Sequence, residues 1–121
     1  MAKKYVKFEV SDEIANKAYE LVQVASTGGK IRRGTNETTK SIERGNAKLV
    51  VVASDVEPEE IVMHIPEICE EKGIPFVYVP SKTDLGKFAG MPVISAAIAI
   101  DEVGSGEKLL KDILNALPKK E

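Results

Sequence analysis

Apolar and polar residues follow two different periods along the chain, and one of them predicts short strands. Nearly unbroken apolar runs at 49–53, 75–79 and 93–100 are typical of strands buried on both faces. Tyr5–Val10 alternates between apolar and charged or polar side chains, which predicts a further strand. Lys30–Arg33 is short and basic, and it predicts either a strand or a turn. These segments are expected to form a small sheet.

The other period is helical and predicts five helices. They are expected at 11–28, 34–45, 57–73, 81–90 and 109–117. Ser11 and Ser81 can cap the first and fourth helices with their side chains. Pro66 must kink or restart the third, and Pro118 ends the last. Because helices and buried strands alternate, residues 1–121 are expected to form one domain, a three-layer α/β/α sandwich with a small mixed sheet.

Composition narrows the class of protein. The chain has 121 residues, of which 43% are apolar and 30% charged, and it contains one cysteine. A chain of this length can bury a core of its own, and a single cysteine cannot form an internal disulfide. No apolar run approaches the roughly 18–20 residues that cross a bilayer, and no signal peptide precedes Tyr5. A cytoplasmic protein without membrane contact is expected.

Charge is unevenly distributed along the chain. The net charge is −2, whereas proteins that bind nucleic acids are usually basic. Between Lys30 and Lys48, however, six basic residues stand against two acidic ones, a local excess of +4. The rest of the chain carries −6, much of it between Asp55 and Glu71. A polyanion would therefore be held at one local site and repelled elsewhere.

Residues suited to catalysis or to metal binding are few. His64 is the only histidine and lies in an apolar-rich run, where a half-buried structural role is expected. Cys69 is flanked by Ile68 and is expected to be a small core residue rather than a nucleophile. The glycines at 104–106 and 28–29 lack the spacing of dinucleotide or phosphate-binding loops. No catalytic residue, metal site or cofactor is expected.

One alternative function depends on Asp55, which follows the apolar run at 49–53. An aspartate in this place resembles the phosphorylated residue of response-regulator receiver domains. Such domains also need an acidic pair after the first strand, which Asp12 and Glu13 could supply, and a lysine after the last. Here Asp101 stands where that lysine belongs, and an acid cannot neutralise a phosphoryl group. The receiver interpretation is therefore the second choice.

The stretch 34–41, Gly-Thr-Asn-Glu-Thr-Thr-Lys-Ser, begins a predicted helix among basic side chains. Backbone N–H groups at a helix N-terminus favour anions such as phosphate, and Gly34 lets another backbone approach closely. Asn36 and Lys40 lie one turn apart, so with Glu37 they can converge on the edge of a nucleic-acid base. A second interpretation is equally open on these residues alone. In it Asn36 caps the helix, and Glu37 is an acid that the helix dipole favours.

The same stretch resembles the Gly-x-Asn-Glu-x-x-Lys signature of the L-seven-Ae family, ribosomal proteins that bind kink-turn RNA. The similarity runs in order from about Val6 to Leu117 and is greatest to the archaeal members. It includes Arg-Gly at 44–45, the run at 48–53, Asp55 with Glu-Pro at 57–58, Cys-Glu-Glu-Lys-Gly-Ile-Pro at 69–75, Ser-Lys at 81–82, Leu-Gly at 85–86 and Pro-Val-Ile at 92–94. One departure is the loop at 90–92, which is shorter than in eukaryotic relatives and has Met91 nearest the place of their arginine. The resemblance implies an α/β/α sandwich, in agreement with the pattern above.

The resemblance also implies a set of RNA-binding residues. Asn36 and Lys40 would donate to guanine O6 and N7 in a sheared G·A pair, and Glu37 would accept from guanine N–H groups. Basic side chains would hold phosphates, and an apolar pair would pack on splayed bases. The full implied set is Lys30, Arg33, Gly34, Thr35, Asn36, Glu37, Lys40, Glu57, Ile61, Lys82, Val93 and Ile94.

Partners follow from the same resemblance. The RNAs that it implies are ribosomal RNA, box C/D and box H/ACA guide RNAs, and ribonuclease P RNA. The protein partners would be those of the ribosome, of the fibrillarin-type methylation particle and of the pseudouridylation particle. The chain would act as a scaffold in ribosome biogenesis and tRNA processing, with catalysis supplied by partners.

Overall fold

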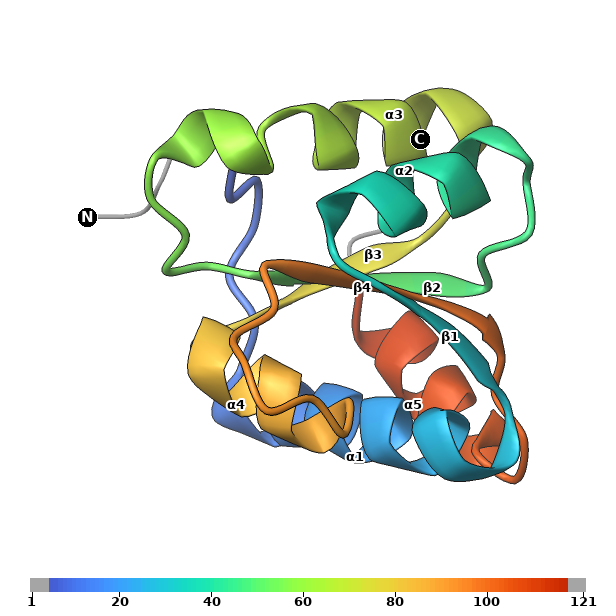
Figure 1. Ribbon diagram of the computed structural model, residues 1–121. Helices are drawn as coiled ribbons and strands as arrows, with labels where there is room; N and C mark the ends of the chain where they lie inside the picture. The colour runs from blue at the N-terminus through green and yellow to red at the C-terminus, as the bar shows by residue number, and fades with distance from the viewer. Residues whose placement is uncertain (1–4, 118–121) are drawn as a thin grey trace.

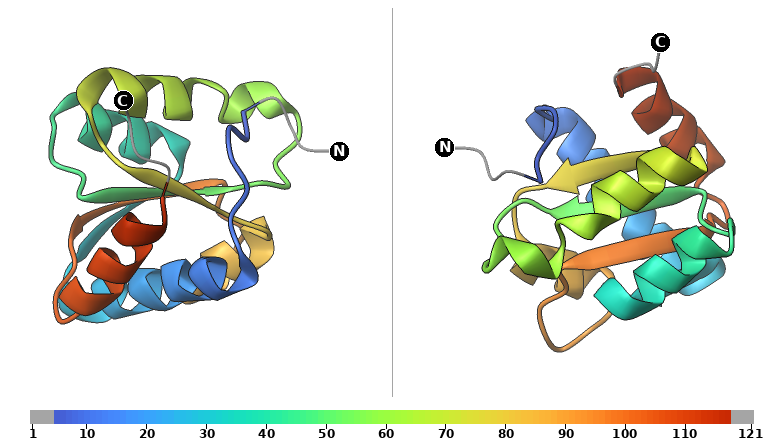
Figure 2. Two further views of the ribbon diagram at one scale, coloured as in Figure 1. Left: turned by 180° about the vertical axis from the view of Figure 1, so that it is seen from behind. Right: turned by 90° about the horizontal axis from the view of Figure 1, so that it is seen from above.

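A computed structural model describes residues 5–117 as a four-stranded sheet between two layers of helices. Figures 1 and 2 show α2 and α3 on one face of the sheet and α1, α4 and α5 on the other. In chain order the elements are α1 (Asp12–Gly28), β1 (Lys30–Arg33), α2 (Thr35–Glu43), β2 (Leu49–Ala53), a 3₁₀ turn η1 (Glu59–Ile61), α3 (His64–Lys72), β3 (Phe76–Val79), α4 (Lys82–Phe88), β4 (Ala97–Glu102) and α5 (Glu107–Ala116). This arrangement confirms the predicted three-layer α/β/α sandwich.

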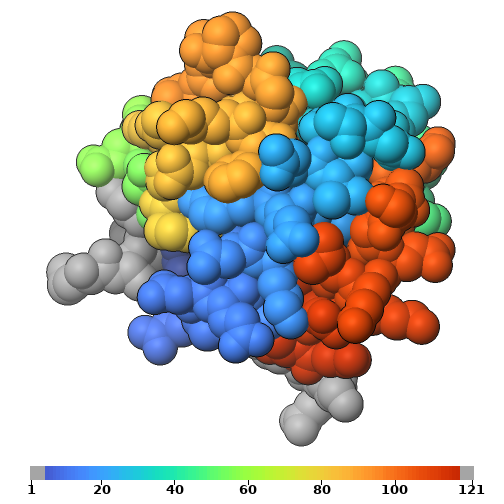
Figure 3. Space-filling view, turned by 90° about the horizontal axis from the view of Figure 1, so that it is seen from below, coloured from blue at the N-terminus to red at the C-terminus, as the bar shows by residue number. Residues whose placement is uncertain are grey.

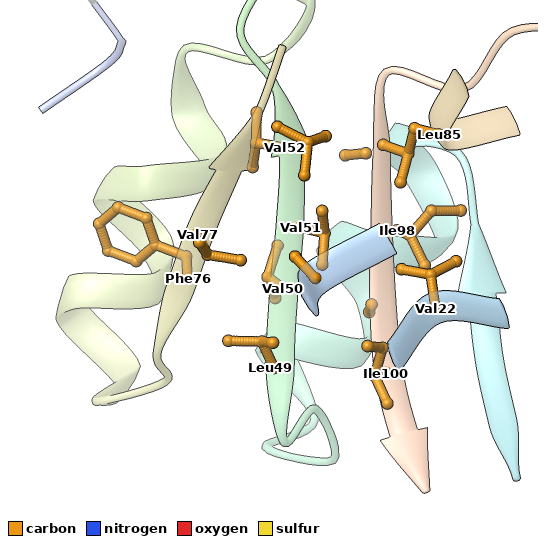
Figure 4. Close-up of a cluster of buried hydrophobic side chains, with 14 of the residues drawn as sticks. Val22, Leu49, Val50, Val51, Val52, Phe76, Val77, Leu85, Ile98 and Ile100 are labelled. Atoms are coloured by element: carbon orange, nitrogen blue, oxygen red, sulfur yellow. The ribbon is translucent and has the colours of Figure 1, made fainter. Parts of the chain in front are cut away.

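The sheet is mixed, as predicted, and its strand order is β1-β4-β2-β3. β2 pairs in parallel with β3, and β4 runs antiparallel to both β2 and β1. All five residues of β2 are buried, which explains why this segment is an unbroken apolar run. Figure 4 shows side chains of β2, β3 and β4 in one cluster with Val22 of α1 and Leu85 of α4.

Ser11 and Ser81 cap the first and fourth helices as predicted. The Ser11 hydroxyl accepts a hydrogen bond from the Ile14 N–H, and the Ser81 hydroxyl accepts one from the Asp84 N–H. The long helix predicted at 57–73 is instead the short turn η1 followed by α3. Pro66 lies in the first turn of α3, where its missing N–H leaves no helical hydrogen bond unmade. Pro118, the predicted end of the last helix, lies outside the described residues.

The predicted strand at Tyr5–Val10 is wrong, because this segment forms no ladder with the sheet. Side chains hold it instead. The Tyr5 hydroxyl donates to the Ala53 carbonyl at 2.8 Å, and the Phe8 ring lies 5.0 Å from the Tyr78 ring between centroids. The alternation of the sequence therefore reflects residues that pack on the edge strand β3 without pairing with it.

The last strand also begins later than predicted, at Ala97 instead of Val93. Before that point the backbone bonds to α4, because the Ser95 N–H donates to the Lys82 carbonyl at 3.0 Å. The Val93 and Ile94 side chains are 60% and 52% exposed. Residues 93–94 are therefore part of an exposed loop, although their composition is that of a buried strand.

Candidate nucleic-acid interface

The N-terminus of α2 is capped by Gly34 and not by a side chain. Gly34 has φ +90°, a conformation that favours glycine, and its N–H donates to the Ala97 carbonyl at 3.0 Å. Asn36 lies inside the first turn and is exposed, so the interpretation of Asn36 as the helix cap is wrong. Glu37 does lie in the first turn, and its carboxylate is 3.5 Å from the Lys40 ammonium. Asn36, Glu37 and Lys40 are all exposed, the first two in the first turn of α2 and Lys40 one turn further along.

A buried polar network fixes the opposite face of α2 to the sheet. The Ser41 hydroxyl donates to the Asp101 carboxylate at 2.5 Å, and the Arg32 Nε donates to the same carboxylate at 3.0 Å. Ser41 and Asp101 are buried, so both groups need these partners. Ile42 and Thr38, both fully buried, lie on the same side of the helix. This anchoring leaves the polar face of α2 directed outward.

His64 contacts α2 through Thr39. The Thr39 hydroxyl donates its one proton to the Thr35 carbonyl at 2.8 Å. It can therefore only accept at its other contact, 2.9 Å from His64 Nε2, so this ring nitrogen carries a proton. The half-buried histidine joins α3 to the first turn of α2, which is a structural role.

Hydrogen bonds bring three further segments close to the N-terminus of α2. They lie at the edge of the sheet where β1, β2 and β3 end and β4 begins. The Ala53 N–H at the end of β2 donates to the Ala96 carbonyl just before β4, and Gly34 contacts Ala97 beside it. The Lys82 N–H at the start of α4 donates to the Asp55 carboxylate at 2.9 Å. Figure 1 shows the result at its left side, where η1, the start of α2, α4 and the loop before β4 lie at one end of the sheet.

Exposed apolar side chains accumulate at this edge. Val93 and Ile94 lie in the loop before β4, and Ile61, 43% exposed, ends the turn η1 that follows β2. Met63, 37% exposed, follows η1 and was not predicted for the site. In the sequence, only the nearness of Met63 to the predicted residue Ile61 could have indicated that Met63 belongs to the site. Large apolar side chains held in water at one edge are typical of an interaction surface.

The predicted phosphate-binding residues Lys30, Arg33 and Lys82 are less uniform in position. Lys82 lies at the edge just described. Arg33, at the end of β1 next to Gly34, donates from Nε to the Ala89 carbonyl at 2.9 Å and so also ties β1 to the end of α4. Lys30 begins β1 and is paired with Glu102 in the ladder, so it lies at the opposite end of the strand, about 13 Å from Gly34 at ~3.3 Å per residue.

The remaining predicted residues are placed as follows. Thr35 is half-buried at the first position of α2, and its carbonyl accepts from Thr39. Glu57 is exposed in the segment between β2 and η1, four residues before Ile61 and at the same edge. The structure therefore brings together eleven of the twelve predicted residues at one end of the sheet, and Lys30 is the exception.

The structure gives no support to the interpretations that need reactive side chains. Cys69 is fully buried, and burial raises the pKa of its thiol to about 12, which keeps it protonated and inert at neutral pH. Asp55 is a hydrogen-bond acceptor for α4, and Asp101 is paired within the network under α2. Within residues 5–117 no group of three ligating side chains could hold a metal ion.

The face formed by α1, α4 and α5 carries a shallow hollow between α1 and α4, on the side of the molecule drawn in Figure 3. It is lined by Asn16, Tyr19, Glu20, Gln23, Asp84, Lys87 and Phe88. The Tyr19 ring stacks on Phe88, and its hydroxyl both donates to the Ser81 carbonyl and accepts from the Ser81 N–H. Burial also raises the pKa of this hydroxyl. The tyrosine therefore serves packing and the start of α4.

None of the helices in the described part of the chain has the length and apolarity needed to cross a membrane.

Comparison with known proteins places this geometry in a family. The model of the ribosomal protein L7Ae/L30e/S12e/Gadd45 family matches residues 16–110. Among solved structures, a 15.5 kD RNA-binding protein of Giardia lamblia matches with 31% sequence identity and a TM-score of 0.87, over 93% of this chain and 94% of that one. The chain therefore belongs to the ribosomal protein L7Ae/L30e/S12e/Gadd45 family.

Proposed function

We propose that this protein binds kink-turn RNA and acts as a scaffold for ribonucleoprotein assembly. Family membership and the likeness to an RNA-binding protein support RNA as the ligand. The observation that carries the proposal is the shared edge of the sheet. There the exposed polar face of α2, with Asn36, Glu37 and Lys40, lies beside the exposed apolar pair Val93 and Ile94.

This combination suits an irregular RNA and not a regular duplex. A-form RNA hides the base edges of its major groove, so proteins recognise elements in which bases are unpaired or splayed out. A sheared G·A pair leaves guanine O6, N7 and N1–H exposed. Asn36 and Lys40 supply donors, and Glu37 supplies the acceptor that phosphate binding alone would not require. Val93 and Ile94 supply an apolar surface for bases that have left the stack.

Glu37 and Lys40 form an ion pair in the free protein. Its 3.5 Å separation and its exposure make it weak, so guanine groups can replace it at little cost. Arg33 and Lys82, at the borders of the same surface, would contact phosphates and position the RNA without reading sequence. Negative charge on α3, at Glu67 and Glu71, disfavours RNA on that helix.

The wider roles belong to the same proposal. The RNAs would be ribosomal RNA, guide RNAs of both box classes, and ribonuclease P RNA. The protein would work in the cytoplasm, with the other proteins of the ribosome and of the methylation and pseudouridylation particles, and they would supply catalysis.

A gel-shift titration tests the proposal directly. The protein is expected to retard a kink-turn RNA and to bind at least tenfold more weakly to an RNA of the same length in which the sheared G·A pairs are replaced by A·G, since each specific contact contributes about 1–3 kcal/mol. Equal affinity for the two RNAs would contradict kink-turn recognition. Uptake of phosphate from acetyl phosphate at Asp55 would favour the receiver interpretation instead.

Charge at the edge of the surface gives a second test. Lys82→Ala is expected to reduce the slope of log affinity against log salt by about one released counterion, with a similar effect on every kink-turn sequence. Lys108→Ala, at an exposed position on α5, is the matched control and should leave the slope unchanged.

Lys30→Ala decides whether RNA extends along β1. An unchanged slope would remove Lys30 from the site.

A further inference from the structure

The loop that carries Val93 and Ile94 lies directly against α4 at Gly86. A Cβ atom added to Gly86 would lie 2.1 Å from the Val93 carbonyl oxygen and 3.2 Å from the Ile94 carbonyl carbon. Non-bonded carbon atoms pack best at about 3.5–4.0 Å, so no side chain fits here while the loop keeps its place. The obstacle is backbone, which cannot rotate away as a flexible side chain could.

Hydrogen bonds hold the loop against α4 on both sides of the apolar pair. The Met91 N–H donates to the Gly86 carbonyl at 2.9 Å, and the Ser95 N–H donates to the Lys82 carbonyl at 3.0 Å. The buried Ser95 hydroxyl donates to the Ala97 carbonyl at 3.1 Å. The backbone of the loop is therefore fixed at Met91 and at Ser95, while the two side chains between them are more than half exposed.

Val93 and Ile94 are exposed, so their side chains do not stabilise the folded state by burial. The close packing of their loop on Gly86 therefore needs an explanation other than folding. Binding costs less when the groups that make contact are already ordered, because their conformational entropy is lost during folding and not during association. The position of Gly86 is helical and carries no positive φ. Alanine is the better helix former at such a position, so the helix itself does not require glycine here.

We propose that Gly86 is a positioning residue for RNA. By carrying no side chain, it lets the loop pack on α4 and hold Val93 and Ile94 in the direction needed to contact RNA bases. This inference rests on the proposed function. It adds that the apolar half of the surface is preformed, and that its placement depends on a residue that does not itself contact RNA.

The test compares Gly86→Ala with Gly28→Ala. Both add one methyl group to a helical glycine, but the Cβ at Gly28 would meet no atom within 4 Å. Gly86→Ala must displace the loop by roughly 1 Å to restore an ordinary contact. We expect about tenfold weaker binding to kink-turn RNA through faster dissociation, with an unchanged salt slope, because the lost contacts are apolar. Gly28→Ala is expected to bind as the wild type does.

A double-mutant cycle separates positioning from a general loss of folding. If Gly86 acts through the loop, Gly86→Ala and Ile94→Ala should together cost clearly less than the sum of their separate effects. Gly86→Ala and Glu37→Ala should add, since Glu37 lies on α2. Additive costs with Ile94, or equal coupling to both residues, would overturn the proposal.

Ser95→Ala supplies a milder change in case Gly86→Ala does not fold. It removes the hydrogen bond to Ala97 without adding an atom, and a few-fold loss of affinity coupled to Ile94 is expected. Amide chemical shifts of Met91 and Ser95 in the free protein provide a measurement without RNA. Unchanged shifts at both amides in folded Gly86→Ala would overturn the proposal, whereas failure of the wild type to bind kink-turn RNA would overturn the proposed function alone.

Discussion

Replacing both Asn36 and Glu37 by alanine is expected to weaken binding to kink-turn RNA by about 2–6 kcal/mol, twice the ~1–3 kcal/mol of one specific base contact. Both side chains are exposed in the first turn of α2, and neither caps the helix. Their removal therefore leaves the helix and its buried anchors in place. Weak binding to a plain RNA duplex should stay the same, so the protein should lose its preference for kink-turn RNA over the duplex.

A second pair on the same helix and the turn after it provides the matched control. Glu43 and Asn46 are also a glutamate and an asparagine, and both are exposed, but Glu43 is the last residue of α2 and Asn46 follows the helix. Replacing both by alanine should leave the affinity for kink-turn RNA within a factor of about two, as for surface positions away from a contact. Equal losses from the two pairs would show that α2 contributes only its general charge and stability.

Local signals in the sequence predicted most of the fold. The run at 49–53 indicated a strand buried on both faces, and this strand lies inside the sheet. Ser11 and Ser81 indicated helix starts because capping depends on a few neighbouring residues. Such features are decided within one or two turns of chain, so periodicity and end chemistry suffice to locate them.

The errors arose where contacts distant in sequence decide the structure. Val93 and Ile94 have the composition of a buried strand, but the loop containing them is bonded to Lys82 and packed on Gly86. The segment before α1 alternates as a strand does, yet it packs on β3 through rings and hydroxyl groups. Apolar composition indicates that a side chain has something to contact, and it does not indicate whether that partner is the core or a ligand.

The candidate site shows the same division. The signature at the start of α2 was predicted, because Gly34, Asn36 and Lys40 lie within two turns of one another. The network below it was not, since Ser41 and Arg32 lie 60 and 69 residues from Asp101 in the chain. The resemblance implies Lys30 as a site residue, and the direction of β1 places it at the far end of the strand from Gly34.

Saturating protein alone, in low salt without magnesium, is expected to bring the two helix ends of a kink-turn RNA together. The α2 N-terminus and the Val93–Ile94 loop lie at one edge of the sheet. In the proposed complex both contact the RNA at once, which a sharply bent RNA would allow and an extended one would not. Bending crowds phosphates, so free RNA under these conditions is mostly extended. A ligand shifts such an equilibrium only by its difference in affinity for the two forms.

The free energy required is within reach of this surface. Moving a 1:99 equilibrium to 99:1 takes about 5.5 kcal/mol of differential affinity. Two or three base contacts at ~1–3 kcal/mol each, together with neutralised phosphates, supply that amount. Fluorescence transfer between dyes on the two helix ends measures the bent fraction, and Glu37→Ala should lower it at limiting protein concentration. If transfer stays at the value of extended RNA while saturating protein is demonstrably bound, the protein binds without selecting the kink, and recognition must be sought in contacts that both RNA forms share.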